Sequence, residues 1–203
     1  MKVSVVALGI SNLGSLVEAF RRVGASPEVI ETPGEILSSP RLVLPGVGAF
    51  GEGMASILRL GLKLPLQDYA ASGRPLLGIC LGMQLLFDAS HEQGNHEGLG
   101  ILRGEVQKLV SPGPEFRLPH MGWSDVESTV KGRLLLGKDP APYYFLHSYV
   151  AEVRNHDEVA GTFAFGAPRT AAVAQKRVFG VQFHPEKSAD PGLDLLQRFT
   201  ALT

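Results

Sequence analysis

Short apolar runs and stretches of helical spacing alternate through the first half of the chain. Residues 3–8 form an apolar run that ends at Gly9, which is typical of a central strand in a parallel sheet. Helical spacing then continues until Gly24, and we expect Ser11 or Asn12 to cap this helix. Its apolar face consists of Leu13, Leu16, Val17, Phe20 and Val23. The pattern predicts a first unit of one strand and one helix.

Two further short strands are expected in this half, over residues 27–30 and 41–44. Helical stretches separate the strands, and such alternation is typical of a doubly wound parallel sheet. We therefore predict an α/β fold with a mostly parallel, doubly wound sheet flanked by helices. In such folds, ligands bind beyond the carboxyl ends of the strands.

Three more helices are predicted from spacing and from terminal signals. Helical spacing covers residues 54–60 and 64–71, and we expect the break between these two helices near Gly61 and Pro65. A last helix should begin at Asp190-Pro191, with the aspartate as cap and the proline in the first turn. Its apolar face consists of Leu193, Leu196, Phe199 and Leu202.

The second half of the chain is dominated by short predicted strands. They cover residues 105–110, 122–126, 143–146, 148–153, 159–164, 171–175 and 178–183. Strands this close in sequence mostly form hairpins, so we predict antiparallel additions that flank the sheet. Because no repeat or interdomain linker interrupts the chain, we expect a single domain over residues 1–203.

Composition and charge exclude several classes of partner. The 203 residues include 19 basic and 20 acidic side chains, which gives a net charge of −1. Without a long basic run, we expect neither nucleic acid nor a membrane as a partner. The single cysteine cannot form an internal disulfide. The first residues lack the pattern of a secretory leader, and no apolar run reaches transmembrane length, so a cytoplasmic protein is expected.

The single cysteine lies where an apolar run changes to helical spacing. Residues 75–79 are typical of a buried strand, and the apolar residues after Cys80 recur at helical spacing. Gly78 and Gly82 flank the cysteine, so the backbone can turn sharply and leave the sulfur exposed at a tip. A side chain in the first turn of a helix also lies near unpaired N–H groups that favour a thiolate. This arrangement predicts a nucleophile, and the alternative is a buried cysteine that packs as a small apolar residue.

A histidine and a glutamate near the end of the chain form a second candidate pair. Pro185 favours an extended backbone at His184, and residues two apart in an extended chain project to the same side. The carboxylate of Glu186 would then reach the imidazole and orient it as a base. The alternative is a solvated surface pair at the end of a strand.

A glycine-rich turn over residues 45–51 follows the third predicted strand. It can offer backbone N–H groups to an oxyanion, although ordinary connections between a strand and a helix are also rich in glycine. The chain has neither a phosphate loop nor a dinucleotide fingerprint, so no cofactor is expected. Residues 91–98 contain two histidines, but Asn95 stands where a zinc-protease helix needs the second one. We expect a polar loop there and no metal site.

Cysteine, histidine and glutamate occur in an order that suits acyl transfer on an α/β sheet. The Gly-Ile-Cys-Leu-Gly-Met-Gln run at 78–84 and the Gln-Phe-His-Pro-Glu-Lys-Ser run at 182–188 resemble the motifs of the triad, or class I, glutamine amidotransferases. Within that family, three further segments are similar to those of the glutaminase subunits of imidazole glycerol phosphate synthases. They are Leu-Pro-Gly-Val-Gly-Ala-Phe at 44–50, Pro-His-Met-Gly-Trp at 119–123 and Tyr-Phe-Leu-His-Ser-Tyr at 144–149.

The resemblance implies a role for each motif. Cys80 would attack the side-chain amide of L-glutamine, His184 would protonate the departing ammonia, and Glu186 would hold the imidazole in place. Water would then hydrolyse the γ-glutamyl thioester to glutamate. The oxyanion would meet backbone N–H groups of Leu81, Val47 and Gly48, and in this family the glycine-rich turn can reorient before it donates. The implied contacts to the rest of glutamine come from Gly46, Gln84, His147, Ser148 and Tyr149.

The resemblance also implies a partner. Released ammonia would pass to a (β/α)₈ cyclase subunit, which would form a heterodimer with this chain and make imidazole glycerol phosphate in histidine biosynthesis. Met121, Trp123 and Lys187 are similar to residues that face this partner, although core packing is the simpler role for a methionine or a tryptophan. The family commonly has Asp-Tyr-Gly-x-Gly-Asn after the first strand, whereas residues 7–12 here are Ala-Leu-Gly-Ile-Ser-Asn. This departure affects the expected interface and leaves the three catalytic positions unchanged.

Other functions remain open at this point. The chain could be a glutaminase that serves pyridoxal phosphate synthesis, a γ-glutamyl hydrolase without an ammonia acceptor, or a non-catalytic regulatory domain of the same fold. The 45–48 and 119–123 segments argue against the first two. The presence of Cys80, His184 and Glu186 together argues against the third.

Overall fold

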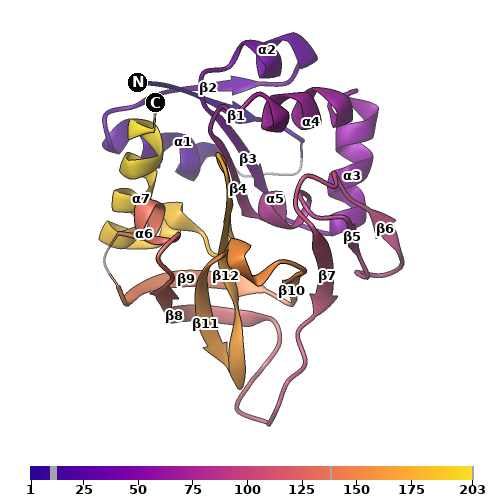
Figure 1. Cartoon of the computed structure of the whole chain (residues 1–203), viewed down its shortest axis with the longest axis vertical. Coiled ribbons are helices and arrows are strands. Elements are labelled where there is room, and N and C mark those ends of the chain that lie inside the picture. The colour runs from indigo at the N-terminus through magenta and orange to yellow at the C-terminus, as the bar shows by residue number, and fades with distance from the viewer. Residues whose placement is uncertain (10–12, 138, 203) are drawn as a thin grey trace.

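The computed structural model describes residues 1–9, 13–137 and 139–202, which form two β-sheets with helices around the larger one (Figure 1). Nine strands of this described part make the larger sheet. In spatial order they are β2 (Ser26–Ile30), β1 (Lys2–Val6), β3 (Leu42–Gly46), β4 (Leu76–Cys80), β13 (Val178–Val181), β12 (Ala167–Gln175), β11 (Val159–Phe165), β8 (His120–Ser128) and β9 (Ala141–His147). The first five run parallel to one another, and the last four extend the sheet in antiparallel pairs. The predicted fold class is confirmed.

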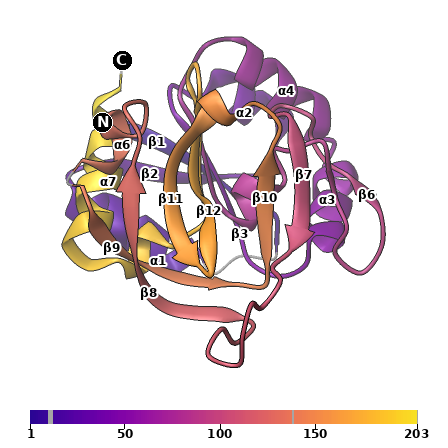
Figure 2. The ribbon, with the colours of Figure 1, turned by 60° about the horizontal axis from the view of Figure 1, so that its bottom comes forward.

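The smaller sheet lies beside the antiparallel part of the larger one (Figure 2). In spatial order it contains β10 (Tyr149–Val153), β7 (Gly104–Lys108), β5 (Ala89–Ser90) and β6 (His96–Glu97). Only Ser148 separates β9 of the larger sheet from β10 of the smaller one. The chain therefore crosses from one sheet to the other at this residue.

Helices cover both faces of the parallel strands, as a doubly wound sheet requires (Figure 1). On one face lie α1 (Leu13–Arg22) and α7 (Ala189–Ala201), and on the other lie α2 (Pro33–Ser38), α3 (Phe50–Arg59) and α4 (Lys63–Ala71). Neighbouring strand residues alternate between the two faces, because Val5 joins the core beneath α1 and α7 while Val6 joins the core beneath α3 and α4. Among the described residues, none of the helices has the length and apolar character of a membrane span.

Several predicted helix boundaries are wrong, for local reasons. Gly61, at φ 68°, breaks the chain between α3 and α4, whereas Pro65 lies in the first turn of α4, where a proline is tolerated. Helix α7 begins at Ala189 after Ser188, so Asp190 is a residue of its first turn and not its cap. The caps predicted for α1, Ser11 and Asn12, lie outside the described residues.

One strand of the second half pairs differently from the prediction. β13 is not part of a hairpin addition alone, because it pairs in parallel with β4 on one side and antiparallel with β12 on the other. It thus completes the parallel sheet next to the strand that carries Cys80. The short helix α6 (Arg133–Leu136), which packs near α7, was not predicted.

Candidate active site

Cys80 sits in a sharp turn between β4 and the four-residue helix α5 (Leu81–Gln84). Its backbone has φ 53° and ψ −113°, a strained conformation for a residue with a side chain. The flanking glycines make this turn possible: a Cβ atom on Gly82 would lie 1.7 Å from the carbonyl oxygen of Leu44, and one on Gly78 would lie 2.7 Å from the Cα atom of Met83. The cysteine itself is only 7% exposed, so the prediction of a sulfur exposed at a tip is wrong. The sulfur instead lines a pocket.

His184 follows β13 and is held in place through both its main chain and its side chain. Its backbone N–H donates to the carbonyl oxygen of Tyr144 at 2.9 Å, and its carbonyl oxygen accepts from the hydroxyl of Ser188 at 2.6 Å. The imidazole Nδ1 lies 2.8 Å from Oε1 of Glu186. This pair forms in a different way from the one predicted, since residues Pro185–Lys187 make a 3₁₀ turn, and not an extended segment, that brings the carboxylate to Nδ1.

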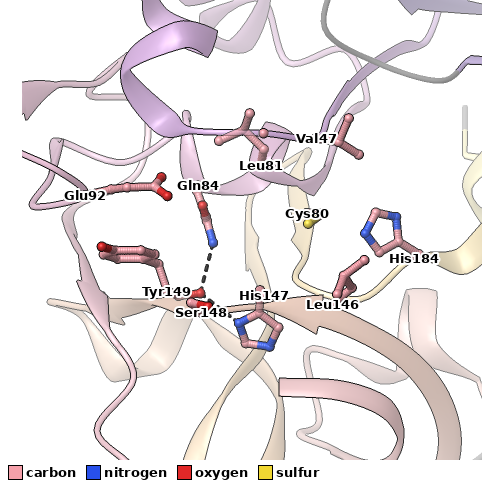
Figure 3. Close-up of a pocket in the computed structure, with 11 residues that line it drawn as sticks. Val47, Cys80, Leu81, Gln84, Glu92, Leu146, His147, Ser148, Tyr149 and His184 are labelled. Carbon is pink, nitrogen blue, oxygen red and sulfur yellow. Dashed lines mark hydrogen bonds between the residues drawn. The ribbon is translucent and has the colours of Figure 1, made fainter. Parts of the chain in front are cut away.

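The electrostatics of the site couple His184 to Cys80, which faces it across the pocket (Figure 3). Burial lowers the pKa of His184, but its hydrogen bonds with Cys80 and Glu186, together with their negative charge, outweigh this effect and raise the pKa to about 10. The ring therefore favours the protonated form beside the sulfur of Cys80. A protonated histidine in this position can give its proton to a leaving group.

One pocket brings together most of the predicted site residues (Figure 3). Its lining consists of Val47, Gly48, Cys80, Leu81, Gln84, Glu92, Leu146, His147, Ser148, Tyr149 and His184. Of the other predicted residues, Gly46 and Glu186 line a second, small cavity that His184 and Val47 also line. The pocket lies beyond the carboxyl ends of β3 and β4, where the fold class predicts a ligand site.

The glycine-rich turn packs closely against the sharp turn at Cys80 between β4 and α5, which is called the elbow below. A Cβ atom on Gly46 would lie 2.9 Å from that of Leu81, so the two backbones can approach only because residue 46 is glycine. Gly48 has φ 98°, a conformation that favours glycine. The backbone of the 46–48 turn is therefore next to the first N–H of α5.

The opposite wall of the pocket is fixed by the main chain between β9 and β10. The carbonyl oxygen of Tyr149 accepts from Nε2 of Gln84 at 3.0 Å and from Nδ1 of His147 at 2.8 Å (Figure 3). Burial lowers the pKa of His147 to about 4, against a smaller opposing effect of this hydrogen bond, so the ring is neutral. A neutral His147 that donates through Nδ1 holds the 147–149 turn in one conformation.

Two polar residues of the site were missed by sequence reasoning. Glu92 lines the pocket, and its Oε2 accepts from the backbone N–H of Phe50 at 2.8 Å, at the start of α3. Gln182 is fully buried, and its Nε2 lies 3.8 Å from the sulfur of Cys80. A glutamine two residues before the histidine, on the same side of an extended segment, was the available signal for the second.

Met121, Trp123 and Lys187 lie outside the pocket, on a surface near its mouth. Met121 pairs with Leu146 and Trp123 with Tyr144 across β8 and β9, so all four side chains share one face of the sheet. Met121 is 63% exposed and Trp123 53% exposed, which excludes core packing for both. The Nζ atom of Lys187 lies 5.8 Å from the ring of Tyr144. These five residues, Met121, Trp123, Tyr144, Leu146 and Lys187, are called the rim face below.

The 91–98 segment is mostly a surface loop. His91 is bound through Nδ1 to Asn95 and through Nε2 to Glu105. His96 instead packs over Gly51 and Phe50. The two histidines thus make separate contacts. The segment also connects the smaller sheet to the start of α3, through the bond from Phe50 to Glu92.

The sequence and the fold both match known proteins. The family model of glutamine amidotransferase class-I matches residues 4–201. The chain is 42% identical to imidazole glycerol phosphate synthase subunit HisH of Wolinella succinogenes, over 97% of this chain and 98% of that protein. It is also 42% identical to the subunit HisH of Rhodopirellula baltica, over 97% of this chain and 96% of that protein.

Solved structures with the same fold are more distant in sequence. A crystal structure of a glutamine amidotransferase superposes with a TM-score of 0.76 at 21% identity, over 98% of this chain and 99% of that one. PurLQS from Thermotoga maritima gives a TM-score of 0.76 at 17% identity, over 98% and 97% of the two chains. The chain belongs to the class-I glutamine amidotransferase family and, within it, to the family of imidazole glycerol phosphate synthase subunits HisH.

Proposed function

We propose that this protein hydrolyses the side-chain amide of L-glutamine and supplies the ammonia to the cyclase subunit of an imidazole glycerol phosphate synthase. The observation that carries the proposal is the pocket in which Cys80, on its glycine-flanked turn, faces the His184–Glu186 pair. Family membership supports the same activity.

The first step is acylation of the cysteine. The sulfur of Cys80 attacks the side-chain carbonyl carbon of glutamine, and the electron pair of the C=O bond moves to the oxygen. His184 then gives its proton to the amide nitrogen, the C–N bond breaks, and ammonia leaves behind a γ-glutamyl thioester. The raised pKa of His184 suits this step, because the ring carries the proton before the substrate arrives.

The second step is hydrolysis of the thioester. The imidazole, now neutral, takes a proton from water as the water oxygen attacks the carbonyl carbon. The C–S bond breaks, and glutamate and a cysteine thiolate are formed. Glu186 keeps Nδ1 of His184 protonated, so that the other ring nitrogen handles the proton in both steps.

The oxyanion of each tetrahedral intermediate requires donors next to the sulfur. We assign this role to the backbone N–H of Leu81 and to one N–H from Val47 or Gly48, because these residues line the pocket beside Cys80. Each donor contributes about 3 kcal/mol in the transition state. A turn that reorients at residues 46–48 would therefore control turnover by roughly two orders of magnitude.

The α-amino and α-carboxylate groups of glutamine would bind at the other end of the pocket. Both N–H groups of the Gln84 amide are used within the protein, so only its oxygen is left to face a ligand. An acceptor suits the α-ammonium group, and the carboxylate of Glu92 in the same lining adds the opposite charge. The main chain of Ser148 and Tyr149 completes this end.

The rim face is assigned to the cyclase partner. It presents an exposed methionine, an exposed leucine and aromatic side chains, and methionine and aromatic residues are enriched at protein interfaces; Lys187 lies at its border. It also borders the pocket through Leu146. A (β/α)₈ cyclase docked here as a heterodimer would cover the pocket mouth and receive ammonia in its neutral form.

The alternatives from the sequence are weaker. A non-catalytic domain would not require a cysteine in a strained conformation beside a histidine that is hydrogen-bonded to a glutamate. A glutaminase of another pathway or a γ-glutamyl hydrolase is disfavoured because HisH subunits match at about 42% identity along 97% of the chain.

A covalent trapping experiment tests the proposed activity. A glutamine analogue with an electrophilic γ-carbon is incubated with the protein and with a candidate cyclase subunit, and the adduct is located by mass spectrometry. We expect a single adduct on Cys80 that excess glutamine suppresses. Adduct formation that glutamine does not slow would contradict a glutamine site.

A further inference from the structure

Two buried side-chain amides connect the main chain of β10 to the sulfur of Cys80. The Nε2 atom of Gln84 donates to the carbonyl oxygen of Tyr149 and to Oε1 of Gln182, both at 3.0 Å. The Nε2 atom of Gln182 lies 3.8 Å from the Sγ atom of Cys80. Gln84 is 5% exposed and Gln182 is 0% exposed. The two amides thus form a continuous polar path through the interior, from the substrate end of the pocket to the nucleophile.

One main-chain carbonyl fixes the orientation of both amides. A carbonyl oxygen only accepts, so the group of Gln84 that faces Tyr149 must be its NH₂. That NH₂ also faces Gln182, which must therefore present its oxygen. The NH₂ of Gln182 is then left to point at the sulfur. Reversing either amide would bring two acceptors or two donors together.

Packing alone does not account for a glutamine at residue 182. A buried amide loses its hydrogen bonds to water, which is unfavourable unless protein partners replace them. Its neighbours Val181 and Phe183 are both fully buried apolar residues. A methionine of similar length would fill the same space without this cost. The amide is explained by its contacts with Gln84 and Cys80.

We propose that Gln182 donates a hydrogen bond that stabilises the thiolate of Cys80, and that Gln84 holds Gln182 in the orientation this requires. The inference rests on the proposed function, because it adds a donor to the same nucleophile. Hydrogen bonds to a charged group are about twice as strong as those between neutral groups. Gln182 and His184 come from one segment, so donor and base reach the sulfur from the same side of the fold.

Alkylation of Cys80 by iodoacetamide tests the proposal in the full chain, where it is the single cysteine. Gln182→Met keeps the length of the side chain but removes the donor. Gln182→Glu keeps its shape and its bond from Gln84, but places a carboxylate beside the sulfur. Gln175→Met is the matched control, since this glutamine donates to Glu158 and does not line the pocket. At pH 7 we expect alkylation about 10- to 100-fold slower in both Gln182 variants and unchanged in the control.

Steady-state kinetics give a second, independent result. Because Gln182 does not line the pocket, its variants should lower kcat for glutamine hydrolysis by a larger factor than they raise KM. Alkylation at the wild-type rate in a folded Gln182→Met protein would overturn the proposal, and so would a raised KM with unchanged kcat. If methionine prevents folding, as a thermal melt would reveal, the Gln182→Glu variant decides by the same criteria. Alkylation needs no glutamine turnover, so it stays informative even if the proposed function is wrong.

Discussion

At the scale of single residues, the site depends on groups whose charges and hydrogen bonds support one another. His184 lies between Glu186 on one side and Cys80 on the other, and both favour its protonated form. Gln182 and Gln84 complete the polar surroundings of the sulfur. Removal of one of these side chains should therefore change the protonation or the hydrogen bonding of its neighbour. Both changes can be measured.

Glu186→Gln should lower the pKa of His184 toward the ordinary value of a histidine. The variant keeps the shape of the side chain but loses the charge that helps to raise the pKa of His184. We expect glutamine hydrolysis to fall by about 100-fold or more, and the pH profile of kcat/KM to shift to lower pH. The control is Glu97→Gln, because Glu97 is highly exposed and makes only a long ion pair with Lys63. An unchanged pH profile in Glu186→Gln would remove the carboxylate from the mechanism.

His147 should make the protein sensitive to mild acid. Its pKa is lowered to about 4 in the folded state and returns to about 6.5 on unfolding, so the unfolded state binds more protons between these values. Its contribution to the free energy of unfolding is thus present above pH 6.5 and is lost as pH falls toward 4, by about 3 kcal/mol.

Chemical denaturation of wild type and His147→Asn over this range measures the effect. The asparagine can still donate to Tyr149 but does not titrate. We expect the variant to lose less stability than wild type as pH falls, and equal losses in both proteins would contradict a neutral buried His147.

Sequence reasoning found the residues of this site that belong to local motifs. Cys80 is identified by its flanking glycines, and His184 and Glu186 by their spacing. Glu92 and Gln182 were missed because their contacts join residues 42 and 102 positions apart. The only local signal was the position of Gln182 two residues before His184, and the contact of Glu92 has no local pattern in the sequence.

At the scale of secondary-structure elements, the site is built where β3, β4 and β13 end side by side. Apolar periodicity predicted most of these elements, because each strand and helix buries one side or both. It did not predict that β13 joins the parallel sheet, since pairing partners depend on long-range contacts that periodicity does not record. The proline signal also placed a break near Pro65, although the first turn of a helix accepts proline.

The elbow itself should tolerate no side chain at Gly82. An added Cβ would lie 1.7 Å from the carbonyl oxygen of Leu44, so β3 and α5 would have to separate. We expect Gly82→Ala to lower the free energy of unfolding by about 3 kcal/mol or more. Gly34→Ala is the matched control, because nothing lies within 4 Å of an added Cβ there, and its effect should stay within about 1 kcal/mol. Equal thermal stability of the two variants would contradict the close approach of the two elements.

The hairpin of β8 and β9 should provide the main contact to the cyclase. Trp123 is exposed and stacks edge-on against Tyr144 at 6.1 Å, which presents a rigid aromatic surface. We expect Trp123→Ala to weaken association with the cyclase subunit by about 30-fold, as for an interface hot spot. Leu64→Ala, at an exposed leucine on α4, should have no effect. Calorimetric titration gives both affinities, and equal values for the two variants would rule out the rim face as the interface.

At the scale of the whole molecule, the larger sheet has an apolar core on each of its two faces and the active site beyond the ends of its strands. Its strands supply residues to the core on each face, so we propose that residues 1–203 form a single domain. The pocket is lined by residues that follow strands of both sheets, and we propose that a partner acts on the turn at 46–48 through the rim face beside it. We therefore expect the isolated subunit to hydrolyse glutamine slowly and its cyclase partner to activate it.

The most direct test of the account is glutamate formation by Cys80→Ala in the presence of a cyclase subunit that activates the wild-type protein. The substitution removes the sulfur and changes little else in the pocket. We expect the variant to fold and to bind the cyclase as wild type does, and to form no glutamate above the uncatalysed rate. Glutamate formation at the wild-type rate would contradict the account, because the nucleophile would then lie elsewhere.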